Sequence, residues 1–387
     1  QSVERALQAA GPGDTIEIKG GTYRPRGNGF PISRGGRADA RIKMKAHNGE
    51  KVIFDADGKN YAVYMDESAA HWILEGIEMS GGTQYTIKID SPNVHMVKCN
   101  LHGSRNDIVK LVQSSNDVVL YANEIHHTSS GVGANAQGID IVGADRVWIA
   151  HNYVHDLSSI GMYAKGNSRN IVFEHNRLEN IASRAIMLGQ STDANLLWDG
   201  LYETYDSIIR NNIVINTTDA CLATASSYNV KIYNNSCYMA ATRAHGAIFV
   251  SNESERGQGG TNVEIRNNIV VSGGSPVFKV GPGAMTDDNT LIVDRNLYWS
   301  TAGAVTFKWE EDRGIVAVDI NQWRSATQKD ATSIVGDPLY ADVKTLTLRN
   351  DSPAIDAGVA TDAVADDYGH RARPAGAGID IGAYEAR

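Results

Sequence analysis

The fold is decided by residues 138–189, which read GIDIVGADRVWIAHNYVHDLSSIGMYAKGNSRNIVFEHNRLENIASRAIMLG. This stretch contains one pattern twice, as VWIAHNYVHD and then as IVFEHNRLEN, with Asn152 and Asn176 24 residues apart. A second short apolar segment follows each copy, GMYAK after the first and AIMLG after the second. Repetition at a short period is typical of a solenoid, in which each copy forms one coil.

The marker of the repeat is an Asn that closes a short β-rich run, and it recurs through much of the chain. Successive markers are at least 23 residues apart, and the longer steps correspond to insertions. A coil of this length favours a right-handed parallel β-helix, because leucine-rich repeats need a Leu spacing that is missing and propeller blades need about 40 residues. We expect the Asn side chains to lie at left-handed corners and to hydrogen-bond from coil to coil. The marked positions are Asn100, Asn123, Asn152, Asn176, Asn212, Asn235, Asn268 and Asn296.

The pattern predicts an all-β chain that forms a single parallel β-helix domain over residues 1–387. Residues 1–20 are expected to form an N-terminal cap, with a short helix from Ser2 to Ala10 that shields a sheet edge. Residues 21–300 are expected to form the coils, and residues 301–387 the last coils and a closing cap.

The composition limits the classes of partner. The 387 residues include 36 basic and 45 acidic side chains, which give a formal net charge of -9. Nucleic acid is not expected as a partner, because its phosphates need a basic surface. An anionic polysaccharide needs only a local basic groove. No apolar run is long enough to span a membrane, so no membrane partner is expected, and we expect a monomer.

The three cysteines are Cys99, Cys221 and Cys237, an odd number without the spacing of a metal site. Buried free thiols are expected from the general burial of Cys. A disulfide between Cys221 and Cys237 remains open at this stage. The sequence starts without the charged and apolar segments of a signal peptide, so the compartment has to be inferred from other features.

The candidate chemistry lies on the outward faces of short strands, because strand side chains alternate between two faces. In IVKLV, GIDIV and GMYAK the aliphatic residues suit the interior, which leaves an outward column of Lys110, Asp140 and Tyr163 with Lys165 beside it. Stacked coils are about 4.8 Å apart, so these groups are expected to be neighbours.

Other polar and aromatic residues extend this column into a groove. The following coils add Arg184, Arg243 and His245, and the loops add His127, Trp198 and Tyr202. Cations bind carboxylates and aromatic rings cover sugar faces, so the groove is expected to bind an anionic sugar chain.

Two stretches carry a resemblance to a known group of enzymes. GPGDTIEIKGGTY (11–23) and RIKMKAHNGEKVIFD (41–55), together with the Asn-marked coils, resemble secreted β-helix polysaccharide lyases. The resemblance covers roughly residues 10 to 300 and includes family 9 pectate lyases, β-helix alginate lyases and the chondroitinase B group. It implies secretion or a periplasmic location.

The resemblance also implies roles for individual residues. In these lyases an outward Lys removes the proton next to a uronate carboxylate, and an Arg or Ca²⁺ offsets the carboxylate charge. Carried over, Lys165 matches the base, Arg184 the charge-offsetting group and Tyr163 a candidate acid. The acidic cluster of the family 9 calcium site is not found, so a role for Ca²⁺ is left open and no other cofactor is expected.

The expected function is a lyase that cleaves a uronate-containing polysaccharide by β-elimination, with alginate favoured and pectate next. Three alternatives remain open: a glycoside hydrolase on the same fold, a uronate C5-epimerase, and a carbohydrate-binding protein without catalytic activity. A hydrolase would need two carboxylates at a defined separation, and Asp140 has no obvious acidic mate in the sequence.

Overall fold

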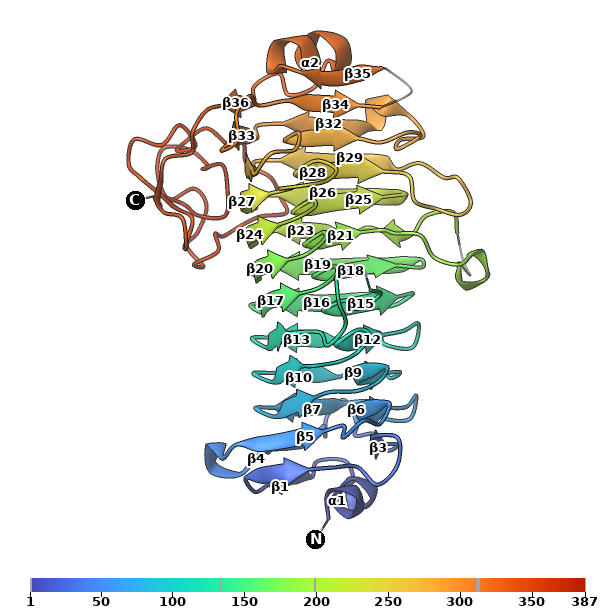
Figure 1. Ribbon diagram of the computed structural model, residues 1–387. Coiled ribbons are helices and arrows are strands. Elements are labelled where there is room, and N and C mark those ends of the chain that lie inside the picture. The colour runs from blue at the N-terminus through green and yellow to red at the C-terminus, as the bar shows by residue number, and fades with distance from the viewer. Residues whose placement is uncertain (1, 133, 198–199, 311–313, 387) are drawn as a thin grey trace. The chain divides into compact units, whose positions relative to one another are not determined.

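The computed structural model describes residues 2–132, 134–197, 200–310 and 314–386. Its contacts divide the chain into two compact units: unit 1 is Gln1–Tyr163 with Ser168–Val172, and unit 2 is Ala164–Asn167 with Phe173–Arg387. Strands β18 (Met162–Lys165) and β19 (Ser168–Glu174) contribute residues to both. Each unit contains three sheets, here called A, B and C, which successive strands join in turn (Figure 1). The expectation of one continuous domain over residues 1–387 stays a prediction.

Unit 1 has parallel strand pairing in all three sheets. Its sheet A contains β1 (Thr15–Ile18), β4 (Ile42–Ala46), β7 (Trp72–Glu75), β10 (His95–Val97), β13 (Val119–Tyr121) and β16 (Asp145–Ala150). Its sheet B contains β2 (Gly21–Tyr23), β5 (Val52–Asp55), β8 (Glu78–Ser80), β11 (Asn100–His102), β14 (Glu124–His126) and β17 (Tyr153–Leu157). Its sheet C contains β3 (Phe30–Ile32), β6 (Tyr61–Met65), β9 (Tyr85–Ile89), β12 (Val109–Leu111) and β15 (Ile139–Val142).

Unit 2 repeats this arrangement and ends sheet C with an antiparallel pair, β34 with β35. Its sheet A contains β22 (Thr204–Tyr205), β23 (Ile208–Arg210), β26 (Ser227–Tyr233), β29 (Thr261–Arg266) and β32 (Leu291–Asp294). Its sheet B contains β20 (Arg177–Ile181), β24 (Ile213–Thr217), β27 (Ser236–Ala240), β30 (Ile269–Ser272), β33 (Leu297–Ser300) and β36 (Ile334–Val335). Its sheet C contains β21 (Ile186–Leu188), β25 (Leu222–Ala225), β28 (Ile248–Ser251), β31 (Phe278–Val280), β34 (Phe307–Trp309) and β35 (Ile315–Val318).

Helices are short in the described part of the chain. The predicted N-terminal helix is present as α1 (Val3–Ala9), and the Ser2 hydroxyl accepts a hydrogen bond from the Arg5 backbone N–H at 3.3 Å, as an N-cap does. The second α-helix is α2 (Ile320–Thr327), and single turns of 3₁₀-helix occur at His47–Gly49, Ala194–Leu196 and Asp288–Thr290. None of these helices has the length and apolar character that crossing a membrane requires.

The core lies inside the coils and is built from aliphatic and aromatic side chains that stack in register. In unit 1, Val109 pairs with Ile139 and Leu111 with Ile141, and all four are fully buried. In unit 2 the inward column of sheet C runs through Leu222, Ile248, Phe278 and Phe307. The inward positions predicted for IVKLV and GIDIV are therefore correct, and burial of this apolar area stabilises each coil.

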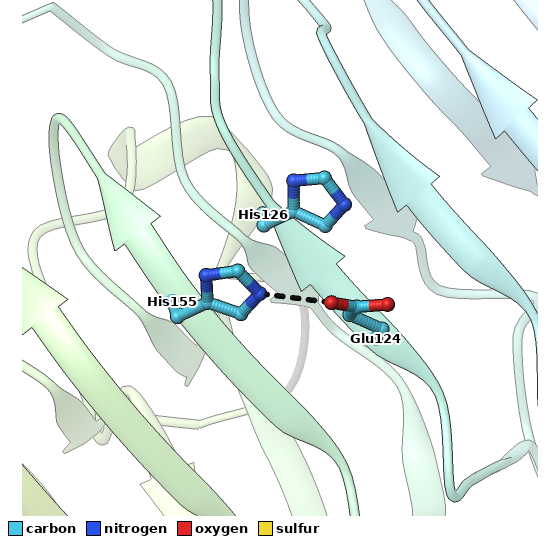
Figure 2. Close-up of side chains that lie close together, drawn as sticks. All are labelled: Glu124, His126 and His155. Atoms are coloured by element: carbon cyan, nitrogen blue, oxygen red, sulfur yellow. Dashed lines mark hydrogen bonds and ion pairs between the residues drawn. The ribbon is translucent and has the colours of Figure 1, made fainter.

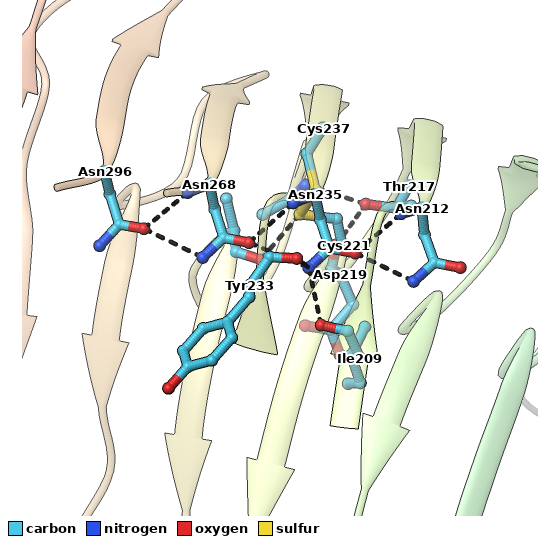
Figure 3. Close-up of a disulfide and its surroundings, with 12 residues drawn as sticks. Ile209, Asn212, Thr217, Asp219, Cys221, Tyr233, Asn235, Cys237, Asn268 and Asn296 are labelled. Carbon is cyan, nitrogen blue, oxygen red and sulfur yellow. Dashed lines mark hydrogen bonds between the residues drawn. A yellow bond between two sulfur atoms is a disulfide. The ribbon is translucent and has the colours of Figure 1, made fainter. Parts of the chain in front are cut away.

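The predicted Asn ladder is present in both units, within each of which it is buried. Figure 3 shows four of its members in unit 2: the side-chain oxygen of Asn235 accepts from the backbone N–H of Asn212 at 2.9 Å, and Asn268 does the same for Asn235 at 3.0 Å. In unit 1, Asn152 accepts from the backbone N–H of Asn123 at 2.9 Å. The ladder gives buried backbone donors at the corners an acceptor.

Two details of that prediction are wrong. Asn100 is not a ladder member, because the preceding Cys99 donates its backbone N–H to Asn123 Oδ1, while Asn100 lies in β11 and donates to Glu124 at 2.6 Å. The left-handed corner is also not the ladder Asn. It is the residue before it, as at His151 (φ 58°) and Asn211 (φ 52°).

Cys221 and Cys237 form a disulfide, which the sequence left open, and Cys99 is a buried free thiol. Cys221 directly precedes β25 of sheet C and Cys237 lies in β27 of sheet B, and both are fully buried. The disulfide therefore crosses the interior of unit 2 and links two of its sheets.

Residues 337–386 contain little regular structure, with β37 (Tyr340–Asp342) and β38 (Thr347–Leu348) as their named strands. Apolar residues of this segment, Leu346, Ala354, Ile381 and Ala383, are buried against side chains of β24, β30 and β33. The segment thus covers the outer face of sheet B in unit 2 (Figure 1).

Candidate functional site

Three polar side chains of unit 2 lie at equivalent turns, each just before a strand of sheet C. Arg184 precedes β21, Asp219 precedes β25 and His245 precedes β28. The Arg184 Nε atom lies 3.4 Å from Asp219 Oδ2, and the His245 Nε2 atom lies 3.6 Å from the same oxygen. A guanidinium and an imidazole therefore converge on one carboxylate oxygen.

Asp219 is fixed by its own chain. Its other oxygen, Oδ1, accepts from the Ala220 backbone N–H at 2.7 Å, and the Thr217 hydroxyl donates to the Asp219 carbonyl oxygen at 2.5 Å. Two residues later, the disulfide from Cys221 to Cys237 attaches the same segment to sheet B (Figure 3). These contacts leave Oδ2 directed at Arg184 and His245.

Arg184 has a second carboxylate partner and an aromatic neighbour. Its Nη1 atom lies 2.7 Å from Glu253 Oε1, and its guanidinium carbon lies 5.3 Å from the centre of the Phe249 ring, within cation–π range. Phe249 projects outward because its neighbours in β28, Ile248 and Val250, are in the core. We call this group the Arg184 cluster; its members are Arg184, Asp219, His245, Phe249 and Glu253.

His245 is the most open ionisable group of the cluster, with 34% of its side chain exposed. Its ring stacks on Phe249 with centroids 4.5 Å apart. Burial lowers the pKa of His245, the Asp219 carboxylate opposes that shift, and the cations Arg184 and Lys279 add to it. The imidazole is therefore neutral near pH 7 and able to accept a proton.

Further cations follow on the next coils of sheet C. Lys279 pairs in register with Phe249 and Lys308 with Lys279, which places all three on the outer face. The two ammonium groups share Glu310, at 3.2 Å and 2.6 Å. This face presents charged pairs beside an aromatic ring, a surface suited to sugar hydroxyls and carboxylates.

Unit 1 contains the predicted column of Lys110, Asp140 and Tyr163, with one addition. Lys110 and Asp140 are in register and form an ion pair, and the Tyr163 hydroxyl hydrogen-bonds to Asp140. Asp107 is the addition: its Oδ2 lies 3.9 Å from Lys110 Nζ, and its Oδ1 accepts from the Gln137 backbone N–H at 3.1 Å. Sequence reasoning placed the column correctly but expected it to face solvent, whereas Asp140 and Tyr163 are almost fully buried.

The charges of this buried group are strongly coupled. Burial and the neighbouring Asp140 carboxylate raise the pKa of Asp107 well above its usual range. Burial alone would lower the pKa of Lys110, but Asp140 and Asp107 together raise it. Asp107 and Asp140 are each 2% exposed, and both pair with the Lys110 ammonium. Glycosidase carboxyl groups flank the scissile bond of a bound sugar, so this buried pair is poorly suited to that role.

Lys165 belongs to unit 2 and lies at the end of β18. Its Nζ atom donates to the Ser191 carbonyl oxygen at 3.2 Å. Glu203, a charged neighbour of Lys165, is fully buried and accepts the Gly166 and Thr192 backbone N–H groups at 3.0 and 3.1 Å. Burial raises the pKa of Glu203, and the Lys165 ammonium opposes that rise.

Lys165 and Arg184 approach β21 from opposite ends. The Gly189 backbone N–H donates to the Ala164 carbonyl at 2.7 Å, so Lys165 is level with the end of β21, while Arg184 precedes the strand. Five residues of extended chain separate Arg184 from Gly189, or about 16 Å at roughly 3.3 Å per residue. The structure therefore does not bring the predicted base and the predicted charge-offsetting group together at the backbone.

The remaining predicted site residues are Tyr202, Arg243, His127 and Trp198. Tyr202 contacts Tyr205 and Tyr228 and shares a hydrogen bond with the Thr261 hydroxyl, on the side of sheet A. Arg243 is exposed, and its backbone N–H donates to the Thr218 carbonyl at 3.0 Å.

His127 follows β14 in unit 1, where its Nδ1 atom lies 2.6 Å from His126 Nδ1. Trp198 lies outside the described residues. Neither His127 nor Tyr202 is a member of the Arg184 cluster.

The sequence leaves a calcium site open, and the candidate ligand side chains among the described residues are poorly suited to calcium. Asp107 and Asp140 already have the Lys110 ammonium between them. In the described ranges, each group of side chains that could hold a metal ion contains at least one imidazole, whereas Ca²⁺ is bound by oxygen ligands. No step below is routed through calcium.

Sequence reasoning missed Asp107, Asp219, Phe249 and Glu253. The spacing did contain a signal for Asp219. Asp219 and His245 each precede a strand of sheet C by three residues, and Arg184 stands at nearly the same place before its own strand. Glu253 gave no such signal, because it follows β28 and reaches back to Arg184 from the opposite end of the strand.

Comparison with known proteins confirms the fold class and the resemblance predicted from the sequence. Residues 1–147 match the family model described as a Pel9A-like, right handed beta helix region. A pectate lyase, PEL9 of Emericella nidulans, is 29% identical over 136 residues, which cover 31% of this chain and 33% of the relative. The match thus spans about a third of the length of that curated relative.

Solved structures agree on the architecture over the greater part of the chain. Pectate lyase Pel9A matches with a TM-score of 0.66 and 16% identity, covering 100% of this chain and 91% of that one. An alginate lyase from Paenibacillus sp. str. FPU-7 matches with a TM-score of 0.52 and 16% identity, covering 82% and 96%. At these identities the matches show the right-handed parallel β-helix fold.

Proposed function

We propose that the chain is a polysaccharide lyase that cleaves a uronate-containing polysaccharide by β-elimination, with the Arg184 cluster as its active site. Pectate is the first candidate substrate and alginate the second, because the sequence relative is a pectate lyase. The observation that carries the proposal is the convergence of Arg184 and His245 on one carboxylate oxygen, on the outer side of sheet C.

The two groups suit the two needs of the reaction. The C5 proton of a uronate becomes acidic enough to remove when the adjacent carboxylate charge is offset, which the Arg184 guanidinium would do. The neutral His245 imidazole would take that proton at Nε2, the nitrogen that faces the cluster. The electron pair of the C5–H bond forms the C4=C5 double bond, the C4–O4 bond breaks, and O4 takes a proton from water.

Lys165 and Tyr163, the base and acid expected from the sequence, have other roles in this proposal. Lys165 lies beyond the end of β21 opposite to Arg184, where it is proposed to contact a neighbouring sugar. Tyr163 is 1% exposed and hydrogen-bonds to Asp140, which supports a role in holding the fold rather than in protonating O4.

The proposal includes secretion to an oxidising compartment, outside the cell or in a periplasm. The disulfide between Cys221 and Cys237 supports this, because disulfides persist in such compartments and are rare in the cytosol. A polymeric substrate would also be met there.

The test is a spectrophotometric screen of pectate, alginate, glucuronan and glycosaminoglycans, with and without EDTA. β-Elimination creates an unsaturated uronate, so absorbance near 235 nm rises when the right polymer is added. In the lyase, Arg184→Ala and His245→Gln should each lower kcat by about 100-fold or more, the usual contribution of a general base or an electrostatic group. Arg349→Ala, which removes a surface pair with Asp351, is the matched control and should keep full activity.

The same assay separates the proposal from its competitors. Lys165→Ala should raise KM with little change in kcat if Lys165 is a substrate contact, whereas loss of kcat would return the base role to Lys165. New reducing ends without absorbance at 235 nm would indicate a hydrolase. Altered uronate stereochemistry without cleavage would indicate an epimerase, and retention on polymer gels without turnover a binding protein. Each of these three results would refute the lyase.

A further inference from the structure

A column of histidines on sheet B of unit 1 is not used by the proposed function. His102 of β11, His126 of β14 and His155 of β17 pair in register, so their side chains leave the same face of the sheet. Their rings stack in turn, with centroids 4.9 Å apart in both steps. Parallel pairing thus holds imidazoles of adjacent coils side by side.

A carboxylate joins two of these imidazoles. Glu124 precedes His126 by two residues on β14, which places both side chains on one face. Glu124 Oε1 lies 3.2 Å from His155 Nε2, and Figure 2 shows the three side chains grouped on their two strands. Ligand atoms of Glu124, His126 and His155 all lie within 4.8 Å of one another.

His155 lies between two carboxylates. Its Nδ1 atom is 2.7 Å from Asp156 Oδ2, and its Nε2 atom is 3.2 Å from Glu124 Oε1. One ring nitrogen therefore has a carboxylate partner on its own strand, and the other faces Glu124, the residue that would share an ion with it.

The surroundings of His155 are those of a metal ligand. A histidine that binds a metal through one nitrogen usually donates its other N–H to a carboxylate or carbonyl, which fixes the ring, and Asp156 provides this. Tyr153 stacks on the opposite side of the ring, with centroids 4.1 Å apart. Only 10% of the His155 side chain is exposed, whereas 44% of Glu124 is, so one side of the group is open to water.

We propose that Glu124, His126 and His155 bind a divalent transition-metal ion, with zinc as the best match, and that water completes a tetrahedral site. Two imidazoles and one carboxylate are a ligand set that zinc takes when a position stays open. Calcium and magnesium prefer oxygen ligands, so this set selects against them. Glu124 Oε1 and His155 Nε2 are already 3.2 Å apart, close to the roughly 3.3 Å that Zn–N bonds of about 2.0–2.1 Å imply. The stacked rings of His126 and His155, which are 12° from parallel, have to turn so that both nitrogens face the ion.

The bound ion would link two adjacent coils of unit 1. β14 and β17 are neighbours in sheet B, and the segment after β14 leads to β15, which carries Asp140. The ion would stabilise the folded chain, because it binds a site that the unfolded chain lacks. The proposal is independent of the lyase activity, and its readouts do not use that activity.

The test measures zinc affinity of tag-free, chelator-treated protein by competition with a chromophoric zinc chelator. Wild-type protein should bind one equivalent of Zn²⁺, and its unfolding midpoint should rise with Zn²⁺ and not with Ca²⁺. Glu124→Gln, His126→Gln and His155→Gln should each weaken zinc binding by about tenfold or more. His102→Gln is the matched control: it removes a histidine of the same column that is not a ligand, and it should bind zinc as wild type does.

Several results would overturn the proposal. One is the absence of stoichiometric zinc binding, and another is wild-type zinc affinity in all three ligand variants. A third is a loss of zinc affinity in His127→Gln that exceeds the loss in Glu124→Gln, because His127 is not one of the proposed ligands. Circular dichroism without metal checks that each variant is folded. If one is not, X-ray absorption of the wild-type complex decides, since fewer than two imidazoles per zinc would contradict the assignment.

Discussion

Replacing Asn235 with Ala removes a fully buried side chain that hydrogen-bonds to both neighbouring coils of unit 2. Asn235 Oδ1 accepts from the Asn212 backbone N–H at 2.9 Å, and its Nδ2 donates to Asn268 Oδ1 at 2.9 Å and to the Ile209 carbonyl at 3.1 Å. The substitution leaves the Asn212 N–H without its acceptor in the interior, at a cost of roughly 1–3 kcal/mol. The two lost donor bonds add about 0.5–1.5 kcal/mol each. We therefore expect a destabilisation of about 2–6 kcal/mol.

This loss is large compared with the roughly 5–15 kcal/mol that holds a typical domain folded. Urea unfolding followed by circular dichroism measures it, as a lower midpoint in Asn235→Ala than in wild type. Asn350→Ala is the matched control, because Asn350 is exposed and its backbone is not left-handed, so its loss should cost at most about 0.5 kcal/mol. Equal midpoints for the two variants would refute the claim that the ladder stabilises the coils.

Three further predictions concern other parts of the molecule. Reduction of the Cys221–Cys237 disulfide, which closes a 16-residue separation, should cost about 3 kcal/mol of stability; an unchanged unfolding midpoint with reductant would contradict this. Lys110→Met should destabilise unit 1, because it leaves Asp140 buried beside a second carboxyl group, and a wild-type midpoint at pH 7 would disprove it. The kcat/KM of the proposed lyase should fall as pH drops, with an acidic limb below the ordinary imidazole pKa of about 6.5, because burial lowers the pKa of His245 and only the neutral ring acts as a base; a limb above that value would exclude it.

The architecture was predictable because short, repeated sequence patterns determine it. The recurrence of Asn123, Asn152 and Asn235 gave the coil length, and the alternation in GIDIV gave the inward and outward faces. The corner conformation was misplaced by one residue, since Asn tolerates both the corner and the ladder position. His151, the residue before the ladder Asn, has the left-handed backbone conformation.

The candidate site was only partly predictable, because its contacts join segments from different coils. Register placed Lys110 beside Asp140 correctly, since two strands with clear alternation define it. The ion pair between Arg184 and Glu253 joins a residue that precedes β21 to one that follows β28, and no spacing rule in the sequence reveals such a contact. Tyr163 is 1% exposed and interacts with Asp140 and Asp107 of other coils, which alternation along its own strand does not reveal.

The segment over residues 337–386 has a consequence for how this scaffold can change. It occupies one flank of unit 2, and the Arg373–Glu385 ion pair within it is 1% exposed in both side chains. A polymer that met that flank would contact this segment rather than the outer face of sheet B. Variation there would have to preserve a buried charge pair, whereas in the Arg184 cluster 34% of the His245 side chain is exposed. Libraries that vary the sugar specificity of the proposed lyase should therefore be confined to the turns and outward positions of sheet C.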